Sequence, residues 1–339
     1  MTLAPSASVI LGNEQFDTHV LRVTAQLAPL PAVGSVHALF PANAQISAAA
    51  GDDATLTLDG GEGSETVLTG SVRMIRRGIS QIEVVVADGG ALLGDLRPAT
   101  TYRNQGADDI IKALASDANV DVASSDTGID IAAYVANQNR TAARHIAELA
   151  AFAGAMARIN GDGELVVDRP SAVMPDVAIK YGREVITCDV QSGAAPSAKR
   201  FLMGSGPAGS TTAPNALRPS KKPLPSGADD AGVDALWTPA AVLRTPTAAA
   251  AASAATDAAK SAASSRIRAT AFLLPKLRPG VVLDVQDVPG GGGPWLLTRV
   301  VHVLDARDGG RTYFEGEEAP SLDLAALAGA ALAALGSLL

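Results

Sequence analysis

Four histidines are the residues of this sequence with the most obvious chemistry: His19, His37, His145 and His302. Imidazole can bind zinc or act as a general base near neutral pH. No two of these histidines stand one helical turn apart, so the spacing that brings two imidazoles to one metal is absent. We therefore expect structural or surface roles for them and no metal site.

Other catalytic patterns are also incomplete. The glycine run "PGGGGP" lacks the Lys-Ser/Thr and the strand-to-helix context of a phosphate-binding loop, so a turn between strands is expected there. Ser205 has no apolar strand and helix on either side, as a nucleophile elbow requires. Glu317 and Glu318 stand beside Glu315 at a strand end, which is typical of a solvated acidic edge. The sequence therefore predicts no enzyme and no cofactor.

The single cysteine and the negative net charge exclude further classes of protein. Cys188 lies in the alternating, strand-like run "REVITCDVQ", so neither a disulfide framework nor a cysteine-based metal site is expected. The formal net charge is −8, and phosphate backbones are bound mostly by Lys and Arg, so we expect no specific nucleic-acid binding. The N-terminus has no basic start followed by an apolar core, so no signal peptide is predicted.

Residues 1–98 alternate short β-rich runs with turn clusters. The runs include "HVLRVTAQLAP", "ATLTLDGG" and "ISQIEVVVADGG". Regular strand lengths separated by Gly, Pro and Asp predict an antiparallel barrel or sandwich. Since 47% of the residues are hydrophobic but only 4% are aromatic, we expect a core of small aliphatic side chains and no large aromatic binding platform.

Residues 99–169 predict a small α/β insert of helix, helix and hairpin. The first helix opens with Asp108 and Asp109, which favour a helix N-terminus, and its apolar residues recur at helical spacing. Thr141 is expected to cap the second helix, and Gly154 stands where a terminal glycine is common. The "NGDG" turn that follows predicts a hairpin.

Residues 170–320 predict a second β region with two unusual segments. A polar arm at 204–232, rich in Gly, Pro, Ser and Thr, cannot hold a core of its own. An alanine-dense stretch at 247–266 is expected to be helical. Three strands with glycine-rich connections then close the region.

Three blocks in this order resemble one known family. They are "LTGSVRMIRRGISQIEVVVADGGALLGDLRPATTYRNQGADDIIKALASDANVDV", "YVANQNRTAARHIAELAAFAGAMARINGDGELVVD", and "LRPGVVLDVQDV" through "WLLTRVVHVLDARDGGRTYFEGE". They are similar to the tail-hub proteins of contractile phage tails and related injection systems, also called late control D proteins and including the hub part of type VI spike proteins. The resemblance covers about 70% of the chain.

The resemblance implies a mainly β fold in which two similar antiparallel barrels, 1–98 and 170–320, flank the α/β insert. It implies a homotrimer whose six barrels form a pseudo-six-fold ring, adapting a hexameric inner tube to a trimeric spike and closing the tube end. Because the chain stops soon after "FEGEE", the spike is expected to be a separate protein. Further implied partners are tube-initiator proteins, baseplate wedge components, and tape measure or cargo in the lumen. Assembly in the cytoplasm into a tail or tail-like particle is expected.

Two other classes stay open. A two-barrel surface adhesin or glycan-binding protein would explain the strands but not the three ordered blocks, and the few Trp and Tyr residues argue against it. A tail-tip cell-wall hydrolase would need a placed acid/base pair, which the sequence does not offer.

The arm and the apolar tail supply the expected interface residues. We predict that the arm around Lys221 and Lys222 orders only against a neighbour, because its composition cannot offset its own ordering entropy. The tail, residues 321–339, is expected to pack in a protein groove or against its trimer mates, and its deletion to weaken assembly; a membrane span and a disordered end are the alternatives. Its apolar stripe includes Leu324, Leu327, Leu335 and Leu338.

Overall fold

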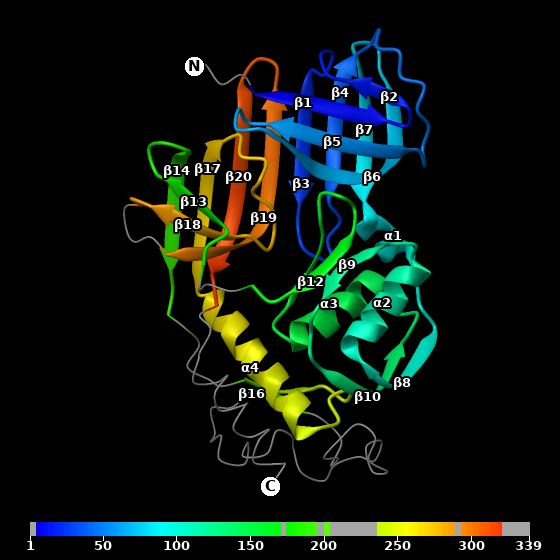
Figure 1. The fold of residues 1–339 in the computed structure, drawn as a ribbon, viewed down its shortest axis with the longest axis vertical. Coiled ribbons are helices and arrows are strands. Elements are labelled where there is room, and N and C mark those ends of the chain that lie inside the picture. Colours follow the sequence, from blue (N-terminus) through cyan, green and yellow to red (C-terminus); the bar gives the residue numbers. More distant parts are fainter. Residues whose placement is uncertain (1–4, 171–173, 195–199, 204–235, 289–292, 321–339) are drawn as a thin grey trace.

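The computed structural model describes residues 5–170, 174–194, 200–203, 236–288 and 293–320. It is mainly β structure with a few helices, arranged as a first β unit, an α/β unit and a second β unit (Figure 1). Among the described residues, no helix combines the length and apolar character needed to cross a membrane.

The first β unit is an antiparallel array in which every second side chain points into a shared core. Its strands follow the order β3-β4-β7-β6-β5-β1-β2. Alternation is clearest in β4 and β5, where every second residue is buried and the residues between them are half-buried or exposed. Its elements are β1 (Ser6–Leu11), β2 (Glu14–Phe16), β3 (Arg22–Leu27), β4 (Ser35–Pro41), β5 (Asp53–Asp59), β6 (Ser64–Arg77) and β7 (Gln81–Asp88).

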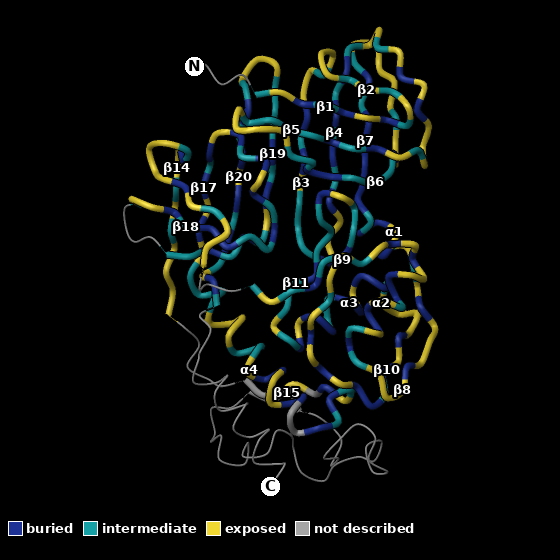
Figure 2. Tube along the Cα trace, in the orientation of Figure 1, coloured by how far each residue is buried: buried dark blue, intermediate teal, exposed yellow. Residues whose placement is uncertain are grey.

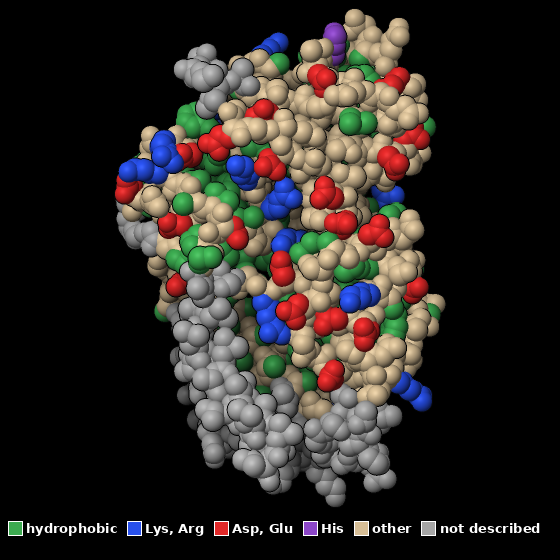
Figure 3. All heavy atoms as spheres, viewed as in Figure 1, with side chains coloured by type: hydrophobic (Ala, Val, Ile, Leu, Met, Phe, Trp, Pro, Cys, Tyr) green, Lys and Arg blue, Asp and Glu red, His purple; other side chains and the backbone are tan. Residues whose placement is uncertain are grey.

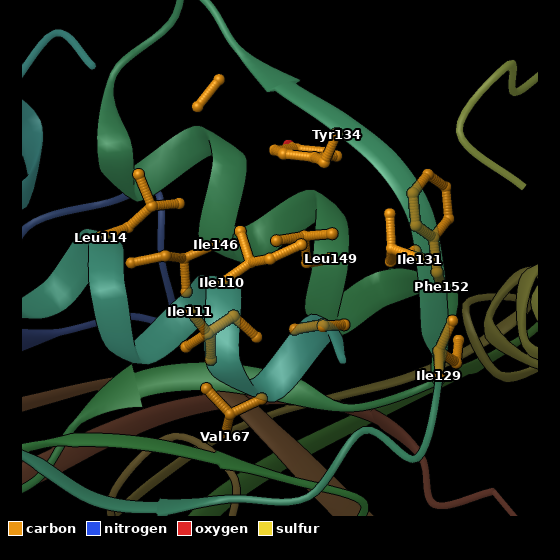
Figure 4. Close-up of a cluster of buried hydrophobic side chains, with 14 of the residues drawn as sticks. Ile110, Ile111, Leu114, Ile129, Ile131, Tyr134, Ile146, Leu149, Phe152 and Val167 are labelled. Carbon is orange, nitrogen blue, oxygen red and sulfur yellow. The ribbon is translucent and has the colours of Figure 1, made fainter. Parts of the chain in front are cut away.

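The α/β unit packs three helices with short strands, around the largest cluster of buried side chains in the described chain (Figure 4). Figure 2 shows the facing sides of its helices as buried and its outer loops as exposed. Its elements are α1 (Gly89–Asp95), β8 (Thr100–Gly106), α2 (Ala107–Asp117), β9 (Val122–Ser125), β10 (Asp130–Ala136), α3 (Ala142–Phe152), β11 (Met156–Ile159) and β12 (Leu165–Asp168).

The core of the α/β unit is wider than the 99–169 insert expected from the sequence. Leu30 and Leu93 enter it from the first β unit and from α1, and Leu243 and Ala249 enter it from the segment around α4. The unit therefore cannot bury its apolar surface with residues 99–169 alone.

Both predicted helices of this unit are present, with the predicted signals in place. Ile110, Ile111 and Leu114 of α2 are fully buried. Asp108 also accepts hydrogen bonds from Ser125 Oγ at 2.6 Å and from the backbone N–H of Thr127 at 3.0 Å, so it connects the helix to the end of β9 and to the loop that follows. The predicted cap of α3, at Thr141, and the positive φ of Gly154 are likewise confirmed.

The second β unit contains β13 (Val177–Lys180), β14 (Val185–Ser192), β17 (Ser265–Phe272), β18 (Val282–Gln286), β19 (Pro294–Asp305) and β20 (Gly309–Glu318). The short pair β15 (Arg200–Met203) and β16 (Leu236–Pro239) is parallel and separate from the main sheet. Helix α4 (Pro246–Ala262) runs from the α/β unit to the start of β17 (Figure 1).

Helix α4 is shorter than the predicted 247–266. It ends at Ala262, and Arg266 lies in β17, paired with Gln191 on one side and Glu317 on the other. The alternation of buried residues in β17 and its pairing with two strands outweigh the helix propensity of the preceding alanines.

Strand β19 joins the two β units into one 13-stranded sheet. Its first residues pair with β18, in the register Val282 to Leu296, and its later residues pair with β3, from Val300 with Leu27 onward. A register shift against β20, between Leu297 and Arg299, marks the changeover. The two β halves, which we expected from the sequence to be separated by the insert, are therefore paired directly.

The hairpin β11–β12 lies between the two β units and contacts both. The backbone carbonyl of Thr66 in β6 lies against Gly161 at the hairpin tip, and Arg278 donates to the same carbonyl at 3.3 Å. At the hairpin base, Arg158 donates to both carboxylate oxygens of Asp168. Figure 3 shows basic and acidic side chains mixed along this boundary. Burial lowers the pKa of Arg278.

His302 is a fully buried structural residue of β19. Its Nε2 lies 3.0 Å from the carbonyl oxygen of Leu277 and its Nδ1 lies 3.0 Å from Thr312 Oγ1. This matches a neutral ring that donates from Nε2 and accepts the threonine hydroxyl at Nδ1. Thr312 Oγ1 in turn accepts from the backbone N–H of Leu274 at 2.9 Å. Burial lowers the pKa of His302 to about 4.

A His302→Gln variant should lose part of the acid sensitivity of folding. As the pH falls, the histidine of the unfolded chain, with a pKa of 6.5, takes up a proton before that of the folded chain, whose pKa is about 4. The stability that the neutral His302 contributes to the fold is therefore fully present above pH 6.5 and is lost as the pH falls toward 4. Between pH 7 and pH 5 this amounts to about 2 kcal/mol. Urea unfolding at both pH values, compared between wild type and variant, measures it.

The comparison must be differential because Asp88 acts in the opposite direction. Its carboxylate accepts from the backbone N–H groups of Gly34 and Gly90, and burial raises its pKa to about 7. Its unfavourable ionisation in the folded state lowers stability as the pH rises from about 4 to 7. The contribution of Asp88 cancels when the unfolding free energy of the variant is subtracted from that of the wild type at each pH. If the unfolding free energies of the two proteins changed equally with pH, the assignment to His302 would be wrong.

Candidate assembly interface

The described residues contain no group of three or more His, Cys, Asp and Glu side chains placed to hold a metal ion. His37 is on the surface of the first β unit, with Nδ1 3.4 Å from Glu83 Oε1. Cys188 is half-buried at the margin of the second β core, and burial raises the pKa of its thiol. A raised pKa leaves less thiolate at neutral pH, so Cys188 lacks the environment of a reactive nucleophile.

Among the described residues, a partly buried polar network in the α/β unit comes nearest to a catalytic arrangement. Tyr134 lies beside the apolar cluster (Figure 4), with its hydroxyl 2.7 Å from His145 Nδ1 and 3.3 Å from Glu148 Oε2. Glu148 also accepts from Arg140 at 2.9 Å, and the other nitrogen of His145 lies 3.2 Å from the Asn137 carbonyl oxygen.

This network holds β10, the following loop and α3 together. Burial raises the pKa of Tyr134 above its ordinary value, and the nearby Glu148 carboxylate raises it further, so the phenol stays protonated. Both ring nitrogens of His145 have partners inside the unit. The arrangement therefore satisfies buried polar groups where a β strand meets a helix, as folded cores require.

The outer face of the joined sheet is a more extended candidate. It runs across β14, β17, β20, β19 and β3, so it spans both β units. A shallow hollow of about 640 Å³ lies on it. Tyr313 is 45% exposed there, opposite Thr270 of β17 on one side and Val301 of β19 on the other. A surface that crosses both units can hold them in one orientation against a partner.

Opposite charges alternate across one row of this face. Strand register places Asp189 of β14 opposite Arg268 of β17, Arg268 opposite Glu315 of β20, and Glu315 opposite Arg299 of β19. Arg268 Nε lies 3.7 Å from Glu315 Oε1. Exposed pairs of this kind contribute little to folding, about 0–1 kcal/mol each, but an ordered row of charges can set the register of a docking partner.

Two further arginines line the same surface. Arg22 stands at the start of β3 beside the hollow. Arg311 of β20 lies with its guanidinium carbon 5.4 Å from the ring centre of Phe272, whose side chain is 51% exposed. On a chain of net charge −8, this face gathers arginine and exposed aromatic side chains, which are enriched at protein interfaces.

The interface residues expected from the sequence are different ones. Lys221, Lys222, Leu324, Leu327, Leu335 and Leu338 all lie outside the described residues, so their interface role stays a prediction. The sheet face was missed because its rows depend on strand register. The signal that could have found it is the polar residue at every second position of "SRIRATAF" and "RTYFEGEE".

Comparison with solved structures shows which known proteins share this fold. A tail protein from Neisseria meningitidis MC58 superposes with a TM-score of 0.69 at 16% identity, covering 93% of this chain and 97% of its own. The 43 kDa tail protein of prophage MuSo2 from Shewanella oneidensis gives 0.67 at 16% identity, covering 94% and 99%. The chain has the fold of a phage tail protein.

The tail-protein fold extends to a secretion machine. An E. coli component of the type VI secretion system, described as structurally similar to the T4 tail proteins gp27 and gp5, gives a TM-score of 0.60 at 12% identity and covers 91% of this chain and 76% of its own. No protein-family model matches the sequence, and neither does any curated protein. The resemblance noted from the sequence is thus supported at the level of fold.

Proposed function

We propose that this protein is a structural hub of a contractile tail or injection machine. The observation that carries the proposal is the near-complete superposition on two tail proteins, over 93% and 94% of this chain and 97% and 99% of theirs. Conservation of the whole architecture, and not of one module, favours a role in which the shape of the molecule is its function.

In this proposal the two β units act as two similar barrels, so that a homotrimer presents six of them as a pseudo-six-fold ring. Such a ring adapts a hexameric inner tube to a trimeric spike and closes the tube end. The direct pairing of β19 with β3 supports it, because a ring element must hold its two barrels at a constant angle. Superposing the β strands of residues 6–98 on those of 170–320 tests the repeat.

The partners follow from the same position in the particle: two further copies of the chain, a separate spike, tube or tube-initiator proteins, baseplate wedge components, and tape measure or cargo in the lumen. The protein has no catalytic role here and does not bind nucleic acid specifically. An acidic surface facing a conduit would repel DNA or acidic cargo and allow its passage. The protein is assembled in the cytoplasm and is then part of a virion or of a phage tail-like particle.

Reversing one charge of the sheet face should weaken assembly without unfolding the chain. In Arg299→Glu a carboxylate faces Glu315, which costs about 1 kcal/mol or less of folding free energy. At a docking surface the same reversal should weaken association at least about 10-fold. Lys112→Glu, an exposed reversal on α2, is the control. Equal association of both variants, measured by solution mass across a dilution series, would remove the sheet face from the interface.

Loss of the gene in the producing cell separates the three function classes. Without a hub, complete tails should not form, and the wild-type gene supplied in trans should restore them. Complete particles that no longer attach to target cells would instead indicate an adhesin. Complete particles that attach but fail to degrade the wall would indicate a hydrolase.

A further inference from the structure

A second hollow in the molecule, an apolar groove of about 360 Å³, lies between α3, α4 and the ends of β19 and β20. Alanines from the last three turns of α4 form one wall, and the C-terminal end of α3 forms the other. Leu296 closes it toward the sheet. The two helices come together at its base, where a Cβ on Gly154 would lie 3.3 Å from the Cβ of Ala255.

The groove exists because α4 is covered along only half of its length. Ala248, Ala249 and Ala252 are buried in the core of the α/β unit. Beyond them the helix leaves that unit on its way to β17 (Figure 1), and Ala258 and Ala259 are exposed. The uncovered alanines recur at helical spacing, and side chains this small let a second helix approach closely.

The chain itself brings an apolar segment to this groove. Pro320, the last described residue, is part of the groove wall, and residues 321–339 follow directly. Leu324 and Leu327 begin a stripe that repeats at three and four residues, as one face of a helix would. We propose that residues 321–339 dock in this groove of their own chain.

Charge complementarity supports this occupant. Asp323 is the one charged side chain between Ser321 and Leu339. Lys260 is the one basic side chain among the groove residues, and the one acidic side chain there, Glu317, lies 3.9 Å from Arg266. Asp323 is three residues from Pro320, within about 10 Å along the chain, so the segment can place its carboxylate near the lysine while its leucines meet the alanine wall.

Disulfide trapping tests the docking in the full-length protein. In a Cys188→Ser background, Ala259→Cys is combined with Leu327→Cys; a helix from Pro320 to residue 327 rises about 10 Å. We expect a cross-link within one chain, seen as a faster band without reductant and as one joined peptide pair by mass spectrometry. Lys112→Cys with Leu327→Cys is the control, since Lys112 is exposed on α2.

Three outcomes would overturn the proposal. A cross-link formed only between two chains would assign the groove to the segment of a second copy. No cross-link, or a yield equal to that of the Lys112→Cys control, would leave the groove without this occupant.

A charge exchange gives a second readout that a loosely tethered segment would not produce. Asp323→Lys should lower the trapping rate about 2- to 5-fold, as expected for losing one partly exposed ion pair. Adding Lys260→Glu should restore it. A rate unchanged by the first substitution, or not restored by the second, would contradict the Lys260 contact. The assay uses the isolated chain, so its outcome is independent of whether the protein is a tail hub.

Discussion

Replacing Leu114 by alanine is expected to lower the free energy of unfolding by about 2–5 kcal/mol. The side chain is fully buried where α2 faces α3, among Ile110, Ile111 and Ile146 (Figure 4). Its neighbours belong to packed helices and can collapse only partly into the cavity left behind. Urea unfolding followed by circular dichroism measures the loss, and hydrogen exchange should place the faster-opening amides in the α/β unit.

The matched control is Lys112→Ala, two residues earlier on the same helix and exposed to solvent. Alanine is the best helix former, so this variant should unfold within about 0.5 kcal/mol of wild type. A Leu114→Ala loss as small as that of the control would show that the cluster around α2 is not the tightly packed core described here.

A Gly161→Ala variant is expected to loosen the contact between the tip of the β11–β12 hairpin and the first β unit. A Cβ at this position would lie 2.2 Å from the carbonyl oxygen of Thr66 and 3.0 Å from Arg278 Nη1. The first contact is with backbone, so β6 or the hairpin tip must move, and Arg278 would lose its bond to Thr66. We expect a loss of about 1–3 kcal/mol and faster proteolysis near the hairpin, both measurable on the purified protein.

Gly94→Ala serves as the control for the glycine change itself. A Cβ there meets no atom within 4 Å, and the residue is within α1. Removing a helical glycine should leave stability unchanged or raise it by up to about 1 kcal/mol. If Gly161→Ala behaved in the same way, the hairpin tip would not be the close contact that joins the units.

Local patterns predicted the local structure well. The acidic start and apolar spacing of α2, the Thr141 cap of α3 and the "NGDG" hairpin each depend on residues close in sequence. For such elements propensity, capping and burial agree, so a few residues suffice to identify them.

Long-range pairing could not be predicted in the same way. The contact of β19 with β3 joins residues about 280 positions apart, and nothing in either strand specifies the other. Helix α4 ends earlier than predicted for the same reason. The alanines before Arg266 favour a helix, but Arg266 is paired with β14 on one side and with β20 on the other. Tertiary pairing decided both cases.

The candidate interface was predictable only in part. Alternating polar residues in β17 and β20 indicate an exposed sheet face, but the row that joins Asp189, Arg268, Glu315 and Arg299 requires the register of four strands. The groove beside α4 requires knowing where that helix leaves the core. Composition alone pointed instead to the arm and the tail.

The most direct test of the hub proposal is the solution mass of the purified full-length protein, with negative-stain images of the same sample. One chain has a mass of 34.2 kDa. We expect a particle of three chains, about three times that mass, with three-fold symmetry and a central channel. A monomer without a channel, at concentrations up to those used for imaging, would contradict it.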